Sequence, residues 1–292
     1  MALPAVRMLV KLLVVGWVIG CTQMGCSQMG QPPWQAKTVT YSGVELDKQV
    51  VPSAHFQHVV FDNRRASAQQ PTWVFIDGDG NAWLRDGLAS EDPTPVDPLA
   101  LRLMLQVSGR AVYLARPCAF DLARSDPRCS AQVWTVDRYS EEVVESMRSA
   151  LVTYFADDQI VLAGFSGGAV LATQLADRLD SVVGLVTIAG NLDVARWAEH
   201  HGYSAALAAR SAPLRLPPKR QFVRLHVFGA EDDNAPFELS AELLAGDPGA
   251  RVRVFATADH DCCWAELWPR ISAEFQQLME AASLTWVSSA VR

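Results

Sequence analysis

The sequence is poor in the features that define several other classes of protein. Only 25 of its 292 residues are Lys or Arg against 32 acidic residues, the net charge is −7, and no basic cluster exceeds Lys219-Arg220. This balance argues against nucleic acid or an anionic membrane surface as the main partner. The six cysteines include no C-x-x-C pair, and the histidines no H-x-x-x-H pair. We therefore expect neither structural zinc nor a thioredoxin-like redox site, and no cofactor.

A hydrophobic run long enough to cross a bilayer is also missing from the N-terminus. Arg7 and Lys11 precede the apolar stretch 12–20, which falls far short of the roughly 20 residues that a membrane span needs. Residues 1–20 are thus expected to be a signal peptide. Val18-Ile19-Gly20-Cys21 resembles a bacterial lipobox, which implies that Cys21 is acylated after export and anchors the protein in a membrane. Ordinary signal cleavage, which leaves a free protein, is the alternative.

The residue after Cys21 bears on the location of the anchored protein. Thr22 stands where an Asp would suggest retention in the inner membrane. By the same resemblance, we expect an outer-membrane lipoprotein that faces the periplasm of a Gram-negative cell. Residues 21–36 are polar, with glycine and two prolines, and are typical of a flexible tether.

From about residue 37 the chain alternates between strand-like and helix-like segments. Half of its residues are hydrophobic, enough for a substantial core in one domain, 37–292. The first two strand-like segments suit a hairpin, and the later ones are nearly continuous apolar runs, typical of strands covered on both faces. The pattern predicts an α/β fold, a mostly parallel sheet of about eight strands with helices on both faces. The predicted strands are 38–46, 56–63, 72–78, 110–116, 159–165, 182–190, 222–229 and 251–258, and the predicted helices are 97–106, 140–155, 168–179, 240–246 and 265–282.

Two connections, 117–138 and 191–221, are unusually long for a compact domain. Such segments often form lids or binding loops, and we expect small lid insertions here. Decoration without a role is the alternative.

The strongest motif is Gly164-Phe165-Ser166-Gly167-Gly168. It follows a buried-type strand and opens a helix, which is the context that a G-x-S-x-G nucleophile elbow requires. Glycines at 164 and 168 would allow the sharp turn that exposes the serine. A glycine-rich turn with no catalytic role is the alternative.

Over about residues 72–280 this organisation resembles the α/β-hydrolase superfamily, whose triad follows the chain order serine, acid, histidine. The resemblance selects Asp232 in the turn that begins at Gly229, and His260 after the next strand. His260 would accept the Ser166 proton, and Asp232 would orient the imidazole and stabilise its charged form. The acids that remain possible in place of Asp232 are Asp233, Glu231 and Asp193.

The same resemblance places an oxyanion hole beside the serine. Its N–H donors would be Gly167, which follows the nucleophile, and Asp79 in the loop 77–80. Relatives in the superfamily often have His-Gly in this loop, whereas this chain has Asp-Gly. We expect the carboxylates of Asp77 and Asp79 to point away from the oxyanion, toward loop amides or Arg85, and Trp83 to pack beneath the loop.

Export would expose the cysteines to an oxidising compartment, in which thiols tend to pair. Cys118 and Cys129 could close a small ring within one loop. Cys262 and Cys263 could form a bridge between neighbours, although their Cα atoms would lie only about 3.8 Å apart. Pairing between the two sets is the competing arrangement, and the superfamily's sheet order places the two loops far apart.

The sequence also resembles a looser group of exported bacterial hydrolases that share G-D-G near a tryptophan, R-P-C, G-x-S-G-G and H-D-C-C-W. These resemblances imply a serine hydrolase that cleaves an ester or thioester of a small molecule or lipid through an acyl-enzyme. A surface lipoprotein with a degenerate site, which acts as a binding module, is the second hypothesis.

Overall fold

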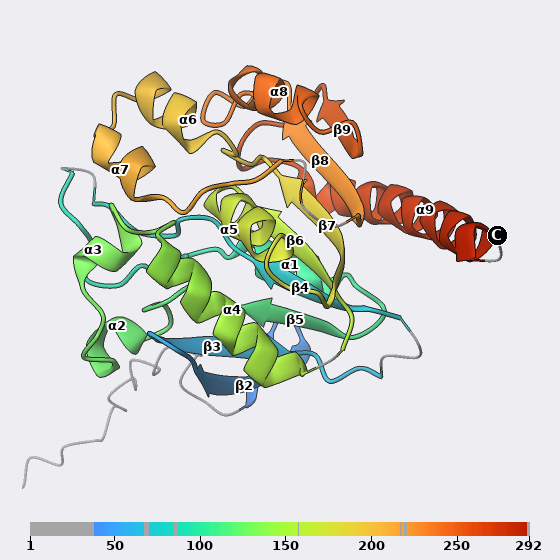
Figure 1. Ribbon diagram of the computed structural model, residues 1–292. Helices are drawn as coiled ribbons and strands as arrows, with labels where there is room; N and C mark the ends of the chain where they lie inside the picture. The colour runs from blue at the N-terminus through green and yellow to red at the C-terminus, as the bar shows by residue number, and fades with distance from the viewer. Residues whose placement is uncertain are drawn as a thin grey trace, which may run out of the picture. The chain divides into compact units, whose positions relative to one another are not determined.

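A computed structural model describes residues 38–66, 70–84, 87–156, 158–216, 218 and 221–290, except the side chains of 284–290 (Figure 1). These residues fall within one compact unit, Pro33–Arg292. The predicted signal peptide, the tether and Cys21 lie outside the described residues. None of the helices in the described ranges is both long enough and apolar enough to cross a membrane.

One sheet holds all nine strands of the described chain, in the order β1-β2-β3-β5-β4-β6-β7-β8-β9. The six strands from β5 to β9 run parallel to one another, and β1, β2 and β3 form an antiparallel extension beside β5. The mostly parallel sheet is therefore confirmed. The strands are β1 Thr38–Tyr41, β2 Val44–Pro52, β3 Gln57–Asp62, β4 Thr72–Ile76, β5 Ala111–Leu114, β6 Ile160–Phe165, β7 Val182–Ile188, β8 Val223–Gly229 and β9 Ala250–Phe255.

The extra strand arises because the segment predicted as the first strand is itself a hairpin. Ser42 and Gly43 have φ of 49° and 79°, which is the left-handed backbone of a two-residue hairpin turn. The chain therefore reverses between Tyr41 and Val44, and β1 pairs with β2 instead of continuing into it.

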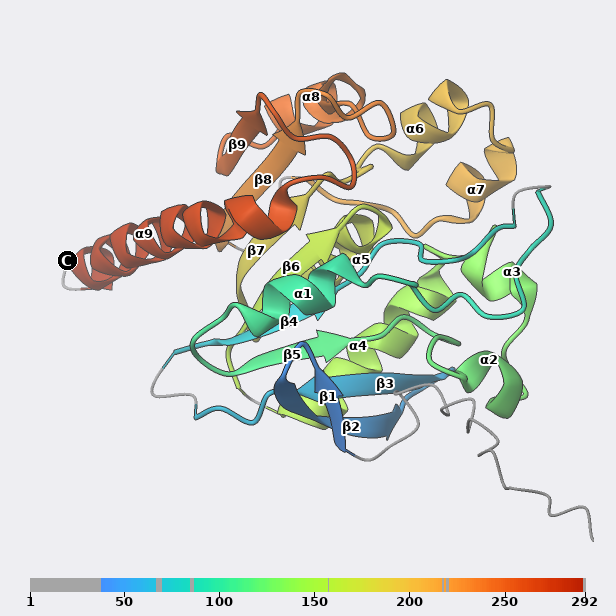
Figure 2. The ribbon, with the colours of Figure 1, turned by 180° about the vertical axis from the view of Figure 1, so that it is seen from behind.

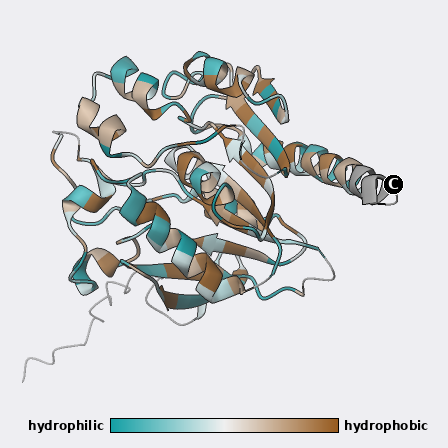
Figure 3. Cartoon of the chain, viewed as in Figure 1, coloured by the Kyte–Doolittle hydropathy of each residue, from teal (hydrophilic) through white to brown (hydrophobic). Residues whose placement is uncertain are grey.

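Helices cover both faces of the sheet. Helices α4 and α5 lie on one face and α1 and α9 on the other, as Figures 1 and 2 show from opposite sides. Helix α4 begins after Ser140, whose side chain accepts a hydrogen bond from the Val143 N–H. In Figure 3 hydrophilic and hydrophobic residues alternate along α4, as expected for a helix with one face on the sheet. The helices are α1 Leu99–Leu105, α2 Leu122–Ser125, α3 Ala131–Trp134, α4 Glu141–Phe155, α5 Gly167–Ala176, α6 Val194–His200, α7 Ala205–Arg210, α8 Phe237–Ala245 and α9 Trp264–Ala290.

Each face of the sheet has its own hydrophobic core. On the α9 face, the Trp268 ring meets Trp73 and Phe75 edge-on, with ring centroids 5.4 Å apart in both pairs. Because Trp73 and Phe75 belong to β4, this packing fixes the central strand from which the loop 77–80 departs.

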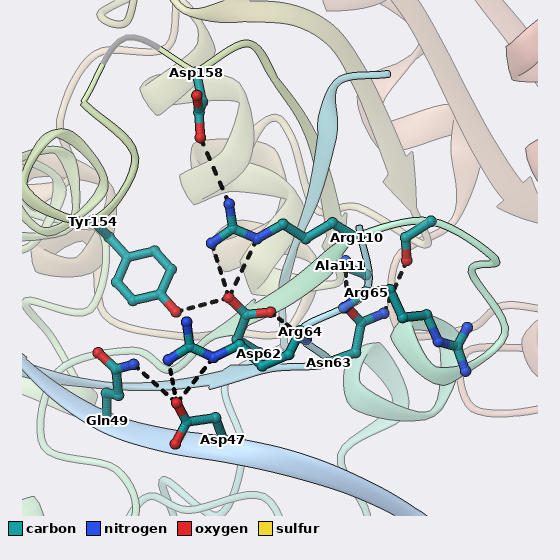
Figure 4. Close-up of polar contacts among 11 residues, drawn as sticks. Asp47, Gln49, Asp62, Asn63, Arg64, Arg65, Arg110, Ala111, Tyr154 and Asp158 are labelled. Atoms are coloured by element: carbon teal, nitrogen blue, oxygen red, sulfur yellow. Dashed lines mark hydrogen bonds and ion pairs between the residues drawn. The ribbon is translucent and has the colours of Figure 1, made fainter. Parts of the chain in front are cut away.

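A buried carboxylate ties the antiparallel part of the sheet to the parallel part (Figure 4). Asp62, at the end of β3, is fully buried. It accepts hydrogen bonds from Arg110 before β5 at 2.9 Å, from the Tyr154 hydroxyl of α4 at 2.9 Å, and from the Arg64 N–H at 2.7 Å. Since a buried charge is tolerated only when it is paired, this cluster stabilises one arrangement of β3, β5 and α4.

Candidate active site

The candidate residues follow the carboxyl ends of four parallel strands. The loop 77–80 follows β4, Ser166 follows β6, Asp232 follows β8 and His260 follows β9. In an open α/β sheet the carboxyl ends of the strands meet at one edge, where ligands usually bind. The four segments converge there.

Ser166 occupies a tight turn between β6 and α5. Its φ and ψ are 50° and −122°, a conformation that costs energy for a residue with a side chain. A Cβ at Gly164 would collide with the Gly168 carbonyl oxygen, and one at Gly168 would collide with the carbonyl oxygens of Ile76 and Asp77. Only glycine at these two positions lets the turn pack against β4.

His260 lies between Ser166 and Asp232. Its Nε2 is 2.9 Å from the Ser166 Oγ, and its Nδ1 is 3.0 and 3.1 Å from the two carboxylate oxygens of Asp232. The Asp232 side chain is fully buried and accepts hydrogen bonds from the backbone N–H groups of Asn234 and Ala235. A carboxylate at Nδ1 requires the ring proton there, which leaves the Nε2 lone pair facing the serine hydroxyl.

The other acids considered lie elsewhere. Asp233 and Glu231 are exposed, and Asp193 caps α6 by accepting a hydrogen bond from the Arg196 N–H. None of the three contacts His260 among the described interactions.

The remaining histidines are also outside the site. His226 is buried in β8 with its Nδ1 2.7 Å from the Thr187 hydroxyl, and His58 lies between the Ala115 carbonyl and the Ser146 hydroxyl. Burial lowers the pKa of each histidine to about 4. Both are therefore neutral structural residues.

The expected oxyanion donors lie beside the serine. A Cβ at Gly78 would stand 3.2 Å from the Ser166 Cβ, so the loop 77–80 packs directly against Ser166. Gly167 is the first residue of α5, where backbone N–H groups have no partner within the helix. Within the described residues, no hydrogen-bond acceptor is found for the N–H of Gly167 or of Asp79.

The Asp79 carboxylate does not point away from this region, contrary to expectation. It lies against Gly167 and accepts hydrogen bonds from Arg116 at 2.6 Å and from the Tyr139 hydroxyl at 2.7 Å. Its other oxygen is 2.8 Å from the Arg138 Nε. Burial acts to raise the pKa of Asp79, but the Arg138 and Arg116 guanidinium groups outweigh it and the pKa is lowered. The expected partner Arg85 lies outside the described residues.

Asp77 does bond loop amides, as expected. Its two oxygens accept from the N–H groups of Gly78 at 3.1 Å and Ala100 at 3.2 Å. Burial raises the pKa of Asp77 from its ordinary value of 3.8 to about 7, although both N–H donors and the Arg116 charge act to lower it.

A cleft of about 470 Å³ opens above Ser166 and His260, a size typical of small-molecule sites. Arg138, Trp197 and Tyr203 line it and come from the two long connections, which also contain four short helices that the sequence did not predict. Trp83 does not pack beneath the loop, because its side chain is 47% exposed and lines the cleft.

The long connections also brace the turn that carries Asp232. The Trp197 indole N–H donates to the Asn234 carbonyl at 2.8 Å, and the Arg138 guanidinium lies over the Trp197 ring, 5.5 Å from its centroid. Since Arg138 also pairs with Asp79, one chain of contacts links the loop 77–80 to the turn that carries Asp232.

The cysteines pair locally. Cys118 bonds Cys129 with Cα atoms 5.6 Å apart, and Cys262 bonds Cys263 with Cα atoms 3.7 Å apart. Strands β5 and β9, which precede the two sets, are separated by β4, β6, β7 and β8, so no disulfide forms between the two sets.

Trp264 is fully buried and its indole N–H donates to the His260 carbonyl at 3.0 Å, which fixes the histidine loop. Within the described ranges, no cluster of three or more His, Cys, Asp or Glu side chains is arranged to hold a metal ion.

This arrangement of sheet and loops is that of the α/β-hydrolase fold. No family model and no curated protein matches the sequence, but solved structures match the fold. Est1E from Butyrivibrio proteoclasticus is 14% identical, with a TM-score of 0.55 over 80% of this chain and 99% of that one. Alpha/beta hydrolase domain-containing protein 10 from mouse gives the same four values. An α/β serine hydrolase without lid from Xanthomonas campestris is 13% identical, with a TM-score of 0.51 over 81% of this chain and 94% of that one. The chain has the α/β-hydrolase fold.

Proposed function

We propose that the protein is a serine hydrolase that cleaves an ester or thioester through an acyl-enzyme. The observation that carries the proposal is the position of His260, whose two ring nitrogens lie 2.9 Å from the Ser166 hydroxyl and 3.0 Å from the Asp232 carboxylate. The turn 164–168, which has the form of a nucleophile elbow, and the similarity in fold to hydrolases also support the proposal. The similarity in fold alone would not, because one fold hosts many activities.

In the proposed reaction, the Ser166 Oγ attacks the carbonyl carbon while its proton passes to the His260 Nε2. The carbonyl oxygen becomes an oxyanion facing the N–H groups of Gly167 and Asp79. When the intermediate collapses, the bond to the alcohol or thiol breaks and His260 donates the proton to the leaving group. Water then attacks the acyl-enzyme by the same route and releases the acid.

The charges around the loop 77–80 support this role for its backbone. A lone Asp79 carboxylate would oppose an oxyanion, but Arg116 and Arg138 both contact it. The two guanidinium groups exceed the charge of the one carboxylate, so their net effect on a developing oxyanion is favourable.

A fluorophosphonate probe tests the proposal. The wild-type protein should be labelled, and Ser166→Ala should not, because the probe needs an activated serine. Ser283→Ala, at a serine in the exposed part of α9, is the matched control and should label like wild type. Labelling that persists in Ser166→Ala would overturn the assignment of the nucleophile. A wild-type protein that folds but does not react would favour the binding-module hypothesis.

We further propose that Cys21 carries a lipid anchor and that the protein faces the periplasm from the outer membrane. The support is the lipobox-like stretch 18–21 and Thr22 in the sequence. Multiple acyl chains, unlike a single one, would hold the domain stably at a membrane.

A further inference from the structure

The cleft above Ser166 is lined by aromatic side chains and has little aliphatic surface. Its aliphatic lining consists of Ala82, Pro95 and Val96, and among the described residues that line it there is no Leu, Ile or Met. An alkyl chain is stabilised by burial against apolar walls, and this cleft offers few. Its aromatic lining consists of Trp83, Phe165, Trp197 and Tyr203.

Two of the aromatic rings reach the mouth of the cleft. Trp83 is 47% exposed and Tyr203 is 50% exposed. Tyr203 stacks on His201 with ring centroids 5.3 Å apart and meets Trp197 at 5.1 Å, so its orientation is fixed before a ligand arrives. Aromatic faces carry partial negative charge and attract the polarised C–H groups of a sugar ring.

Polar side chains that suit hydroxyl groups stand beside these rings. Asn81, Asn234 and Asp261 line the same cleft and are exposed. An amide both donates and accepts hydrogen bonds, and a carboxylate accepts from two hydroxyls at once. Aromatic faces next to such groups match a ring with one C–H face and several hydroxyls.

The charges in the cleft argue against an anionic substrate. Asp97 and Asp261 add two carboxylates to its lining, and Arg138 is the cation among its described lining residues. The Arg138 Nε is already 2.8 Å from Asp79. A neutral ligand avoids the repulsion that these carboxylates would impose on an anion.

The space behind the loop 77–80 is small. The cavity there, between Tyr113, Arg116 and Arg138, measures about 20 Å³. That is room for about one water molecule. A long acyl chain would therefore have to lie in the polar, aromatic cleft, whereas an acetyl group needs no such space.

We infer that the substrate is a neutral sugar that carries a short acyl ester, acetate above all. This inference rests on the proposed function. The sugar ring would lie on Trp83 and Tyr203 with its ester carbonyl at Ser166. The acyl C–O bond breaks, the leaving sugar oxygen takes the proton from His260 and becomes a hydroxyl, and water supplies the hydroxyl of the released acid.

The experiment measures kcat/KM of the full-length protein by acid release on glucose 6-acetate, whose other hydroxyls are free, on ethyl acetate, and on p-nitrophenyl acetate and decanoate. We expect kcat/KM for the sugar ester to exceed that for ethyl acetate by about tenfold or more, because contacts between the sugar ring and the aromatic rings stabilise binding by that factor. We expect kcat/KM for the decanoate to fall below that for p-nitrophenyl acetate. Trp83→Ala and Tyr203→Ala should each lower the ratio of sugar ester to ethyl acetate about tenfold.

Leu88→Ala is the matched control. The Leu88 side chain is 61% exposed but does not line the cleft. Its carbonyl accepts a hydrogen bond from the N–H of Leu84, the neighbour of Trp83, at 2.7 Å, so Leu88 lies close to Trp83 in the fold. Its ratio should equal that of wild type. Rates that rise from acetate to decanoate, or ratios unmoved in both aromatic variants, would overturn the sugar inference while probe labelling of Ser166 keeps the hydrolase proposal intact. Loss of labelling in a folded wild type would instead remove the proposed function itself.

Discussion

The buried Asp77 carboxylate should make the stability of the fold depend on pH. Burial raises the pKa of Asp77 from 3.8 to about 7, so between these values the folded state holds a proton that the unfolded state has lost. The contribution of Asp77 to the free energy of unfolding is greatest below about pH 4, falls as pH rises, and levels off above the folded pKa. The difference from 3.8 to about 7 corresponds to about 4 kcal/mol, since each tenfold change in proton affinity is worth about 1.4 kcal/mol.

Asp77→Asn removes this titration while keeping the shape of the side chain. Urea unfolding followed by tryptophan fluorescence, from about pH 4 to 8, gives the difference in unfolding free energy between variant and wild type. That difference should shift by about 4 kcal/mol in favour of the variant as pH rises. Loss of one acceptor for the Gly78 or Ala100 N–H shifts it equally at every pH. Asp233→Asn, at an exposed carboxylate, is the control and should give a flat difference. A flat difference for Asp77→Asn as well would refute the reasoning.

Three other outcomes are expected. Arg224→Met should lower the unfolding free energy by about 3–5 kcal/mol in urea titrations, because it leaves the fully buried Asp247 carboxylate without its partner at 2.8 Å. Adding Asp247→Asn should recover part of this loss. No recovery would argue against the ion pair as the cause. Gly168→Ala should cost about 3 kcal/mol because its Cβ meets the backbone of β4, whereas Gly109→Ala, whose Cβ meets nothing closer than 3.9 Å, should not; equal melting temperatures would contradict the packing argument. Cys21→Ser should abolish incorporation of labelled palmitate and release the protein from membranes, and unchanged incorporation would exclude Cys21 as the lipidated residue.

The central sheet and the positions of the candidate site residues could be predicted from the sequence, because both depend on local rules. An apolar strand, a glycine turn and a helix in succession place Ser166 at the end of β6. Asp232 and His260 follow β8 and β9, in the chain order of the superfamily that the sequence resembles. The parallel topology then brings strand ends together without further information.

The direction of the Asp79 side chain could not be predicted because its partners are distant in sequence. Arg116 directly precedes the connection 117–138 and Arg138 ends it, and the two short helices of this connection have little periodicity. Helices of four residues give almost no pattern to detect. The cluster of basic partners at Asp79 is set by tertiary packing. The hairpin turn at Ser42-Gly43 is different, because Ser-Gly between two β-rich runs is itself a local turn signal and indicates a reversal of the chain there.

The position of β9 has a consequence for how the site is lost. Strand β9 carries the loop of His260 and lies at the edge of the sheet with β8 as its neighbour, whereas β6, which carries Ser166, lies between β4 and β7. Edge elements open at lower free energy than central ones. Opening of this edge would separate the proposed base, His260, from the proposed nucleophile, Ser166, while the centre stays folded, so loss of the proposed activity would precede global unfolding. The anchor that opposes it is Trp264, at the start of α9. The time for which Ser166 and His260 stay together would therefore depend on the stability of the sheet edge at β9 rather than on that of the central strands.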